Sequence, residues 1–290
     1  MPLLMNRRHF VFLSLLLFTA IVLMPSFAHA QLSDQPPPLS RDFLNDVRNL
    51  EGDSIDFCYY TNSLTADLDI AVATSIGEIL LLDTNIIPID GAISIPGLDF
   101  IPLSEEELFM YLSNECDAFM GFSLAPGAYP EWLTFSRSYV DTRFVAFGRD
   151  TSVDSLSDLQ AGDIVGTVML TEGDTLLGSL ITSQNEASRW RRFPYPDTNL
   201  LVERLLDGTV EIGVAWEPSL EFILDSTGES VKSVSAGTLS LPRRAIGIAL
   251  SSADSFYRNS LDFAIDELIA NGDLAQILDD VQFPGEVPGN

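Results

Sequence analysis

Histidine is almost missing from this chain, because the only two, His9 and His29, lie within the first 30 residues. Those residues read as an export signal: Arg7 and Arg8 precede an apolar run, and Ala28-His29-Ala30 gives a small-x-small cleavage pattern. The chain left after cleavage has no Ser-His-Asp triad, no Cys-His pair and no histidine metal ligand. We therefore predict no catalytic residue, no metal site, no cofactor and no enzymatic activity.

Basic residues are scarce as well. The chain has 15 Lys and Arg against 42 Asp and Glu, and Lys232 is its single lysine. Removal of the signal deletes two arginines, so 13 − 42 gives a net charge of −29. Phosphate binding needs clustered basic side chains, so we expect no nucleic-acid partner and read the acids as a solvated surface. Acids are too abundant for any pair of them to indicate a carboxylate-based hydrolase.

Long apolar runs are absent beyond the signal. The run from Phe10 to Met24 is short for a membrane span, and no later run approaches that length. We therefore expect a soluble periplasmic protein whose signal is cleaved after Ala30. Arg7-Arg8 also resembles the twin-arginine export signal, and both export routes stay open.

Cysteine occurs twice, at Cys58 and Cys116. Two cysteines in an exported chain indicate one disulfide, and the alternative is a pair of buried free thiols. Each cysteine lies beside an expected strand. In the chain-entropy model, closing a loop of this length stabilises the fold by about 4 kcal/mol.

What is present is an alternation of strand and helix patterns, with helices identified by apolar spacing and strands by β-rich runs. In the first half we expect a strand at 54–60, a helix at 66–82, an irregular excursion or hairpin at 84–97, a strand at 98–102, a helix capped at Ser104 and a strand opening at Cys116. In the second half we expect strands at 139–147, 163–169, 210–216 and 245–250, separated by helices. This order predicts an α/β fold built from parallel strands and crossover helices.

The stretch from Cys116 to Arg149 joins the two halves. It reads as the end of one sheet, then a loop broken by Pro126, Gly127 and Pro130, then a strand that crosses to a second domain.

Several strings resemble the family-3 extracellular solute-binding proteins, which are type II periplasmic binding proteins. They are Phe135-Ser136 followed by Tyr139, with Ser138 where proline is usual, Asp207-Gly208-Thr209-Val210-Glu211-Ile212, Gly247-Ile248-Ala249-Leu250 and Asn271-Gly272-Asp273-Leu274. The resemblance spans about Ser54 to Pro284 and implies two Rossmann-like lobes joined by two crossing strands. It further implies a monomer that traps a small-molecule ligand between its lobes, with an ABC permease as partner.

The resemblance also implies a division of the chain. Crossings are expected near Tyr139–Arg143 and Leu241–Ile246. The parts are a signal peptide at 1–30, a lead-in segment at 31–50, lobe one at 51–139 plus 246–284, lobe two at 143–241 and a loose tail at 285–290.

Two departures from the family bear on the ligand. Amino-acid binders of the family hold the substrate carboxylate with an arginine shortly before the Phe-Ser string, but this chain has no basic residue between Asp117 and Ser136. The family's ammonium-binding aspartate is matched here by Trp216. A zwitterion without these partners would lose several kcal/mol on desolvation. We therefore expect a ligand other than an ordinary α-amino acid.

A narrower resemblance is to solute-binding-like accessory proteins of quinoprotein methanol dehydrogenases. Its strings are Cys58, Cys116-Asp117-Ala118-Phe119-Met120-Gly121, Arg137-Ser138-Tyr139-Val140 and Trp216-Glu217-Pro218. A Pro-Phe-Ser stretch expected after Cys58 is absent. This resemblance implies an alternative partner, a periplasmic quinoprotein dehydrogenase, and a role outside transport.

Aromatic residues are the main candidates for contact with the ligand. Tyr59 or Tyr60 and Trp216 follow strands at the carboxyl end, where α/β folds bind ligands, whereas Trp132 fits packing on a lobe better. A helix start at Thr171 to Gly173 could donate backbone amides. Arg137 could pair with a ligand anion or with an acid of lobe one. The predicted ligand-binding set is Tyr60, Tyr129, Arg137, Thr171, Gly173 and Trp216.

Overall fold

The structure is a computed structural model that describes residues 54–90, 103–124, 129–149, 153–237 and 239–289. The expected signal peptide, the lead-in segment and the strand expected at 98–102 lie outside the described residues. Within the described ranges, no helix combines the length and the apolar character needed to cross a bilayer.

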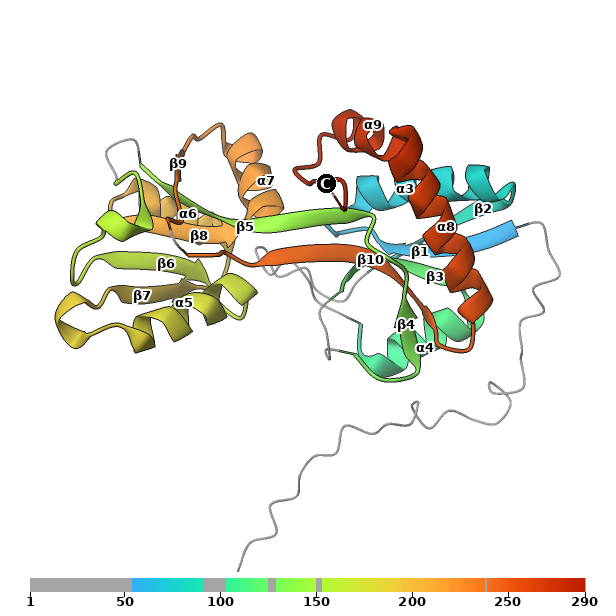
Figure 1. The fold of residues 1–290 in the computed structure, drawn as a ribbon, viewed down its shortest axis with the longest axis horizontal. Helices are drawn as coiled ribbons and strands as arrows, with labels where there is room; N and C mark the ends of the chain where they lie inside the picture. The colour runs from blue at the N-terminus through green and yellow to red at the C-terminus, as the bar shows by residue number, and fades with distance from the viewer. Residues whose placement is uncertain (1–53, 91–102, 125–128, 150–152, 238, 290) are drawn as a thin grey trace, which may run out of the picture. The chain divides into compact units, whose positions relative to one another are not determined.

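The first sheet has the strand order β2-β1-β3-β10, with β4 added alongside β10. β1 lies parallel to β2 and β3, whereas β10 runs antiparallel to β3. The bounds are β1 Ser54–Tyr60, β2 Asp83–Ile89, β3 Ala118–Ser123, β4 Leu133–Phe135 and β10 Arg243–Ser251. Together with its helices this sheet forms lobe one (Figure 1).

The second sheet has the order β5-β8-β6-β7, with β9 also paired to β5. β6 is parallel to β7 and β8, and β5 is antiparallel to β8. The bounds are β5 Val140–Gly148, β6 Ile164–Val168, β7 Arg191–Tyr195, β8 Ile212–Trp216 and β9 Lys232–Val234. This sheet and its helices form lobe two.

Two long strands, β5 and β10, connect the lobes and run side by side (Figure 1). Their antiparallel register joins Arg243 to Arg143 and Ile246 to Val140. The remainder of β5 then pairs with β8, so this one strand takes part in both sheets. The expected α/β fold, with two sheet-centred lobes and two crossing strands, is confirmed. The exact lobe boundaries given above stay predictions.

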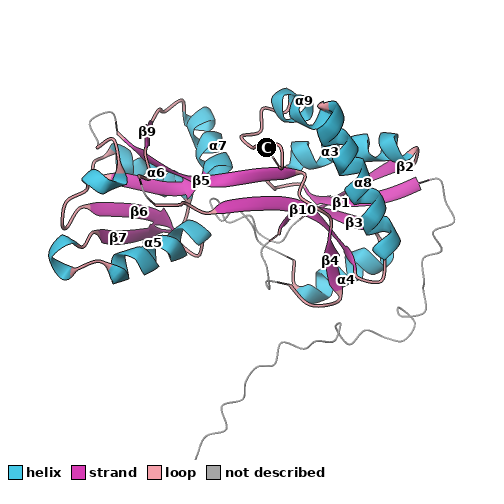
Figure 2. Ribbon diagram, viewed as in Figure 1, coloured by secondary structure: helices cyan, strands magenta, loops and turns pink. Residues whose placement is uncertain are grey.

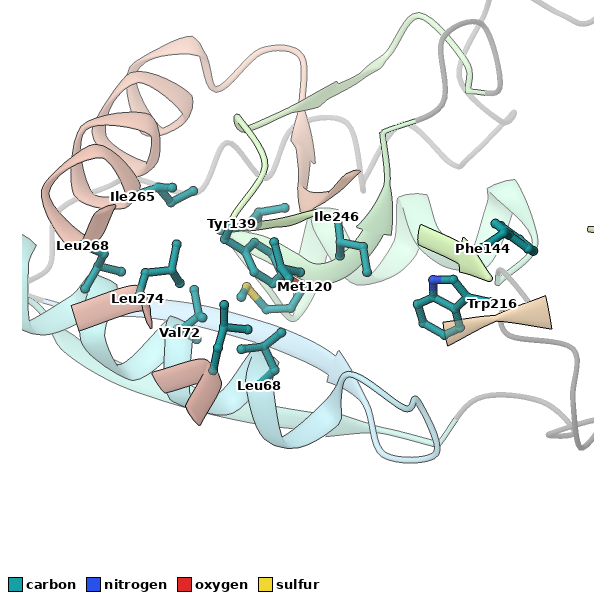
Figure 3. Packing of buried hydrophobic residues seen from close by; sticks show 14 of the residues in the cluster. Leu68, Val72, Met120, Tyr139, Phe144, Trp216, Ile246, Ile265, Leu268 and Leu274 are labelled. Atoms are coloured by element: carbon teal, nitrogen blue, oxygen red, sulfur yellow. The ribbon is translucent and has the colours of Figure 1, made fainter. Parts of the chain in front are cut away.

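Helices cover both sheets (Figure 2). In lobe one they are α3 Ala66–Leu80, α4 Glu105–Asn114, α8 Ser255–Asn271 and α9 Asp273–Asp280. In lobe two they are α5 Glu172–Ser183, α6 Thr198–Leu206 and α7 Glu217–Thr227, with short 3-10 turns at 156–158 and 186–188. Strands alternate between two apolar layers, as the side-chain period of two requires: Phe57 packs with α3 and α8, and Cys58 packs with α4. Figure 3 shows the first layer, with Leu68 and Val72 of α3 near Leu268 of α8.

The expectation of an irregular excursion or hairpin at 84–97 is wrong for the first part of that segment, which forms the parallel strand β2. Pro88 suggested a break there, since proline cannot donate a ladder hydrogen bond. β2 lies at the edge of the sheet, however, and Pro88 faces Tyr59 in the register without interrupting it. An edge position needs no donor on its outer side, so proline is tolerated.

The tail expected to be loose at 285–290 is also corrected for its described part. Glu286 and Asp141 exchange two backbone hydrogen bonds of 3.0 and 2.8 Å, which form an antiparallel bridge to β5. The Glu286 carboxylate also contacts Arg143 at 3.3 Å and Arg243 at 3.1 Å. The C-terminal segment is therefore attached to both crossing strands.

The expected disulfide is confirmed between Cys58 and Cys116, whose Cα atoms are 5.6 Å apart. Cys58 lies within β1, and Cys116 lies just before β3. Both are fully buried in the apolar layer under α4, beside Phe119. The bond therefore ties two neighbouring parallel strands across the core.

Candidate functional site

The two crossing strands present different side chains on their two faces. Side chains alternate along a strand, so cross-strand partners share a face. Arg143 and Arg243 are partners on one face, and Thr142 and Arg244 are partners on the other. The second face continues into lobe two through Phe144, which is paired with Trp216 at the end of β8.

Arg244 is the central residue of that second face. Its guanidinium carbon lies 4.9 Å from the ring centroid of Trp216 and 5.5 Å from that of Phe144, within range of cation–π attraction. Only 10% of its side chain is exposed. Trp216 Nε1 donates to Thr142 Oγ1 at 2.8 Å, and Thr142 Oγ1 donates to the Arg244 carbonyl at 2.9 Å. The guanidinium therefore sits in a fixed place against two rings.

Glu172, the first residue of α5, completes the group. Arg244 donates to both of its carboxylate oxygens, through Nη2 at 2.5 Å and through Nε at 3.3 Å. Partial burial opposes ionisation of Glu172, but the hydrogen bond and charge of Arg244 outweigh it and lower the pKa of the carboxyl. We call Thr142, Phe144, Glu172, Trp216 and Arg244 the crossing-strand cluster. Figure 3 shows Phe144 and Trp216 close together on neighbouring strands.

The start of α5 is held against this cluster by two of the predicted site residues. Thr171 caps the helix: its Oγ1 accepts from the Asp174 amide at 3.2 Å and donates to the Val168 carbonyl at 2.8 Å. At Gly173 an added Cβ would lie 2.7 Å from Cδ1 of Phe144. Glycine is therefore required for α5 to pack this closely on the ring. Thr171 and Gly173 hold the start of α5 against Phe144, which is paired with Trp216. Contact of these three residues with a ligand stays a prediction.

Tyr129 reaches the same region from lobe one. Its hydroxyl donates to the Ser123 carbonyl at 2.8 Å, and its ring packs on Phe135 with centroids 4.6 Å apart. Burial raises the pKa of Tyr129 to about 12, with opposing smaller effects from the charges of Arg244 and Glu172. Both charged groups are therefore close enough to Tyr129 to act on it.

Two predicted site residues are placed elsewhere. Arg137 forms an ion pair with Asp266, and its backbone amide donates to Asp262 Oδ1 at 2.6 Å, so its contacts lie on α8. Tyr60 is buried in the layer under α4, where its ring packs on Phe119 and its hydroxyl accepts from the Leu103 amide at 2.9 Å. Both corrections have one cause: sequence position gives the end of a strand but not the face on which a side chain packs.

Trp132, for which packing was preferred, does pack on lobe one. It is buried with the layer under α4, and its Nε1 donates to Glu105 Oε1 at 2.9 Å.

Sequence reasoning missed Phe144, Glu172 and Arg244. Arg244 lies within the expected crossing at 241–246, and two adjacent arginines in a strongly acidic chain were a usable signal. Its pairing with Glu172 joins residues 72 positions apart, and no spacing rule could have given that contact.

The opposite face of the crossing strands is closed by ion pairs. Arg143 donates to both oxygens of Glu217 at 2.8 Å, a geometry that is among the stronger ion pairs. These residues line a cavity of about 190 Å³ together with Asp141 and the C-terminal segment at 284–286. Among the residues that the structure describes, no group of three or more metal-ligating side chains was found.

Comparison with solved structures identifies the fold. The chain is similar to substrate-binding domain 2 of GlnP from Lactococcus lactis in an open conformation, with a TM-score of 0.61, 15% identity, and 80% of this chain and 96% of that chain covered. It is also similar to the probable amino-acid ABC transporter extracellular-binding protein YtmK from Bacillus subtilis, with a TM-score of 0.58, 13% identity and coverage of 78% and 95%. A substrate-binding domain from Streptococcus pneumoniae gives a TM-score of 0.60, 16% identity and coverage of 78% and 98%.

Searches against family models and against curated proteins found no match. At these identities the structural similarity shows the fold alone, which is that of the type II periplasmic binding proteins.

Proposed function

We propose that this protein is a periplasmic binding protein that captures a small ligand between its two lobes and presents it to an ABC permease. The observation that carries the proposal is the fold, because the similarity extends over 95 to 98% of the length of three extracellular binding domains. Two lobes on two crossing strands give a hinge about which the lobes can close on a ligand.

We further propose that the ligand is not an ordinary α-amino acid. Trp216 stands where the related family places its ammonium-binding aspartate, and its indole is buried and donates to Thr142. The cluster does contain a guanidinium and a carboxylate, on Arg244 and Glu172, but they are bonded to each other. A zwitterion therefore finds an indole, and no carboxylate, at the position from which the related family binds the ammonium.

The test is thermal melting of residues 31–290 against a panel of amino acids, organic acids, amines and polyols. A ligand that binds only the folded state raises the melting temperature by mass action. We expect a rise with at least one class other than amino acids. Trp216→Leu should weaken the response, whereas Phe222→Ala on the exposed face of α7 should not. A rise with amino acids alone would contradict the proposal on the ligand.

A second candidate is an accessory role beside a periplasmic quinoprotein dehydrogenase. The observation that favours it is the disulfide, which joins the two cysteines in the strings that resemble that group of proteins. In this case no member of the panel should shift the melting temperature, and the protein should co-elute with the dehydrogenase in gel filtration.

A further inference from the structure

We propose that the ligand is a small organic carboxylate with an apolar body, and that its carboxylate replaces Glu172 on the guanidinium of Arg244. This inference rests on the proposed function, because it assigns the chemistry of the ligand taken up between the lobes. Glu172 then acts as an internal competitor that occupies the arginine while the site holds no ligand.

The first argument is that Arg244 is the fixed member of the pair. It stacks on Trp216 and Phe144, only 10% of its side chain is exposed, and its carbonyl is held by Thr142. A cationic ligand would have to expel this side chain from both rings to reach Glu172. An anionic ligand needs no movement of Arg244 at all.

The second argument is that Glu172 is the replaceable member. Its side chain is 44% exposed, and its carboxylate is bonded to Arg244 on the crossing strand β10. Water reaches Glu172 and competes with Arg244 for its carboxylate, which lowers the net free energy of the pair. A ligand carboxylate can offer the same two oxygens to the same planar fork of donors.

The other face of the crossing strands gives a contrast. Arg143 is half exposed, and two carboxylates bind it, from Glu217 and Glu286. The second acid would remain on Arg143 if a ligand displaced the first. Arg244 differs because its guanidinium is packed on aromatic rings and, among the residues that the structure describes, Glu172 is the one acid in an ion pair with it.

The apolar body of the ligand is inferred from the surroundings of the pair. The rings of Trp216 and Phe144 lie against the guanidinium of Arg244, and Leu170 lies two residues before Glu172. Leu170 is 83% exposed and adopts a left-handed φ of 67°, which is unfavourable for a leucine. Backbone strain at a residue other than glycine is found often at functional positions.

The experiment titrates sodium benzoate and sodium propionate by calorimetry, with benzamide and benzylamine as neutral and cationic analogues of similar shape. The variants are Glu172→Gln, Arg244→Gln and Arg244→Lys, and Arg243→Gln is the matched control on the opposite face of the same strand. We expect Glu172→Gln to bind benzoate about tenfold or more tightly than wild type, because the competitor is neutral. Arg244→Gln should lose binding, Arg244→Lys should weaken it about tenfold or more, and Arg243→Gln should match wild type.

Circular dichroism and melting of each variant separate loss of binding from loss of fold. Equal binding of benzoate by wild type and Arg244→Gln would overturn the inference, and so would tighter binding of benzylamine than of benzoate. Should the carboxylates fail while another class in the ligand panel shifts the melting temperature, the inference falls and the proposed function stands. Should nothing in the panel bind, both fall.

Discussion

At the scale of single residues, Asp69 is the most unusual ionisable group in lobe one. It is fully buried in the first turn of α3, where it accepts hydrogen bonds from Tyr139 at 2.5 Å and Thr65 at 2.8 Å. The Tyr139 hydroxyl accepts in turn from the amide of Gly121, whose φ of +84° suits glycine. Figure 3 shows the Tyr139 ring beside Met120 and Ile246, at the base of β5.

Burial raises the pKa of Asp69 from 3.8 to about 7, although the hydrogen bonds from Tyr139 and Thr65 act to lower it. The folded state therefore holds this proton more tightly than the unfolded state. The stability that it contributes is complete below the unfolded pKa of 3.8 and is lost as pH rises through about 7. The loss amounts to at most about 4 kcal/mol.

We predict that Asp69→Asn removes this pH dependence. Asparagine keeps an acceptor for Tyr139, and its amide can donate to Thr65, so the network survives without a charge. The variant should match wild type near pH 4 and exceed its free energy of unfolding by up to about 4 kcal/mol near pH 8. Urea unfolding at both pH values measures the difference.

Asp67→Asn is the matched control, because Asp67 lies exposed on the same turn of α3. It should change neither value by more than about 0.5 kcal/mol. A variant of Asp69 that follows the same pH curve as wild type would contradict the buried-proton account.

Single residues of the candidate site also differ in how well the sequence predicted their positions. The strand pattern predicted a strand that ends at Trp216, and β8 does end there. Contact of its buried ring with a ligand stays a prediction. Arg137 belongs to a recognisable string, yet it pairs with α8. The pair of Arg244 and Glu172 depends on how two distant segments meet, which no local pattern records.

At the scale of elements, the disulfide fixes β1 to the chain entering β3, two strands that lie parallel and side by side. Parallel strands need a long crossover, so the bond closes a loop of 58 residues that contains α3 and α4. Closing such a loop restricts the unfolded chain more than the folded one.

We predict that Cys58→Ala/Cys116→Ala lowers the free energy of unfolding by about 4 kcal/mol or somewhat less. Guanidinium unfolding of the double variant and of the oxidised wild type measures it. The wild type treated with a thiol reductant is the control, and it should unfold at the denaturant concentration of the double variant. Identical midpoints for the oxidised protein and the double variant would show that the bond contributes nothing.

Elements with a local chemical signature were predicted well. The capping box of α4 is present as expected, with the Ser104 hydroxyl accepting from the Glu107 amide at 3.2 Å and the Glu107 carboxylate accepting from the Ser104 amide at 3.0 Å. β2 was missed, because proline tolerance depends on a place at the sheet edge and sequence alone does not give that place.

At the scale of the whole molecule, the excess of acids is the dominant electrostatic feature. A formal net charge of −27 destabilises the compact state through self-repulsion. Salt screens charges that are more than about 8 Å apart at 0.15 M ionic strength. The ion pairs of the crossing strands lose some strength in salt as well, but the 42 acidic residues greatly outnumber the 15 basic ones.

We therefore predict that the melting temperature rises between about 0.01 M and about 0.3 M sodium chloride, within the range where screening changes most. A gain of about 1 kcal/mol would raise it by about 2–4 °C for a chain of this size. Sucrose at equal osmolality is the control, since it adds no ions. A melting temperature that falls with salt would mean that attraction between charges outweighs their repulsion.

The fold itself was the most predictable property of the molecule. The alternation of strand and helix patterns predicted an α/β fold with a strand that crosses to a second domain, and the family resemblance implied two lobes joined by two strands. Those patterns show which faces of the strands and helices are apolar. Each apolar face must be buried against another element, and this requirement determines the layered architecture.

One consequence of the C-terminal attachment concerns how this protein should be handled. Glu286 contacts arginines on both strands that link the lobes, so any bending there is transmitted to the last residues of the chain. A fluorophore placed near Gly289 would thus report opening and closing directly. A bulky purification tag at that end would disturb the contacts of Glu286 with the two strands, so a fusion partner is better joined directly ahead of residue 31, in place of the expected signal.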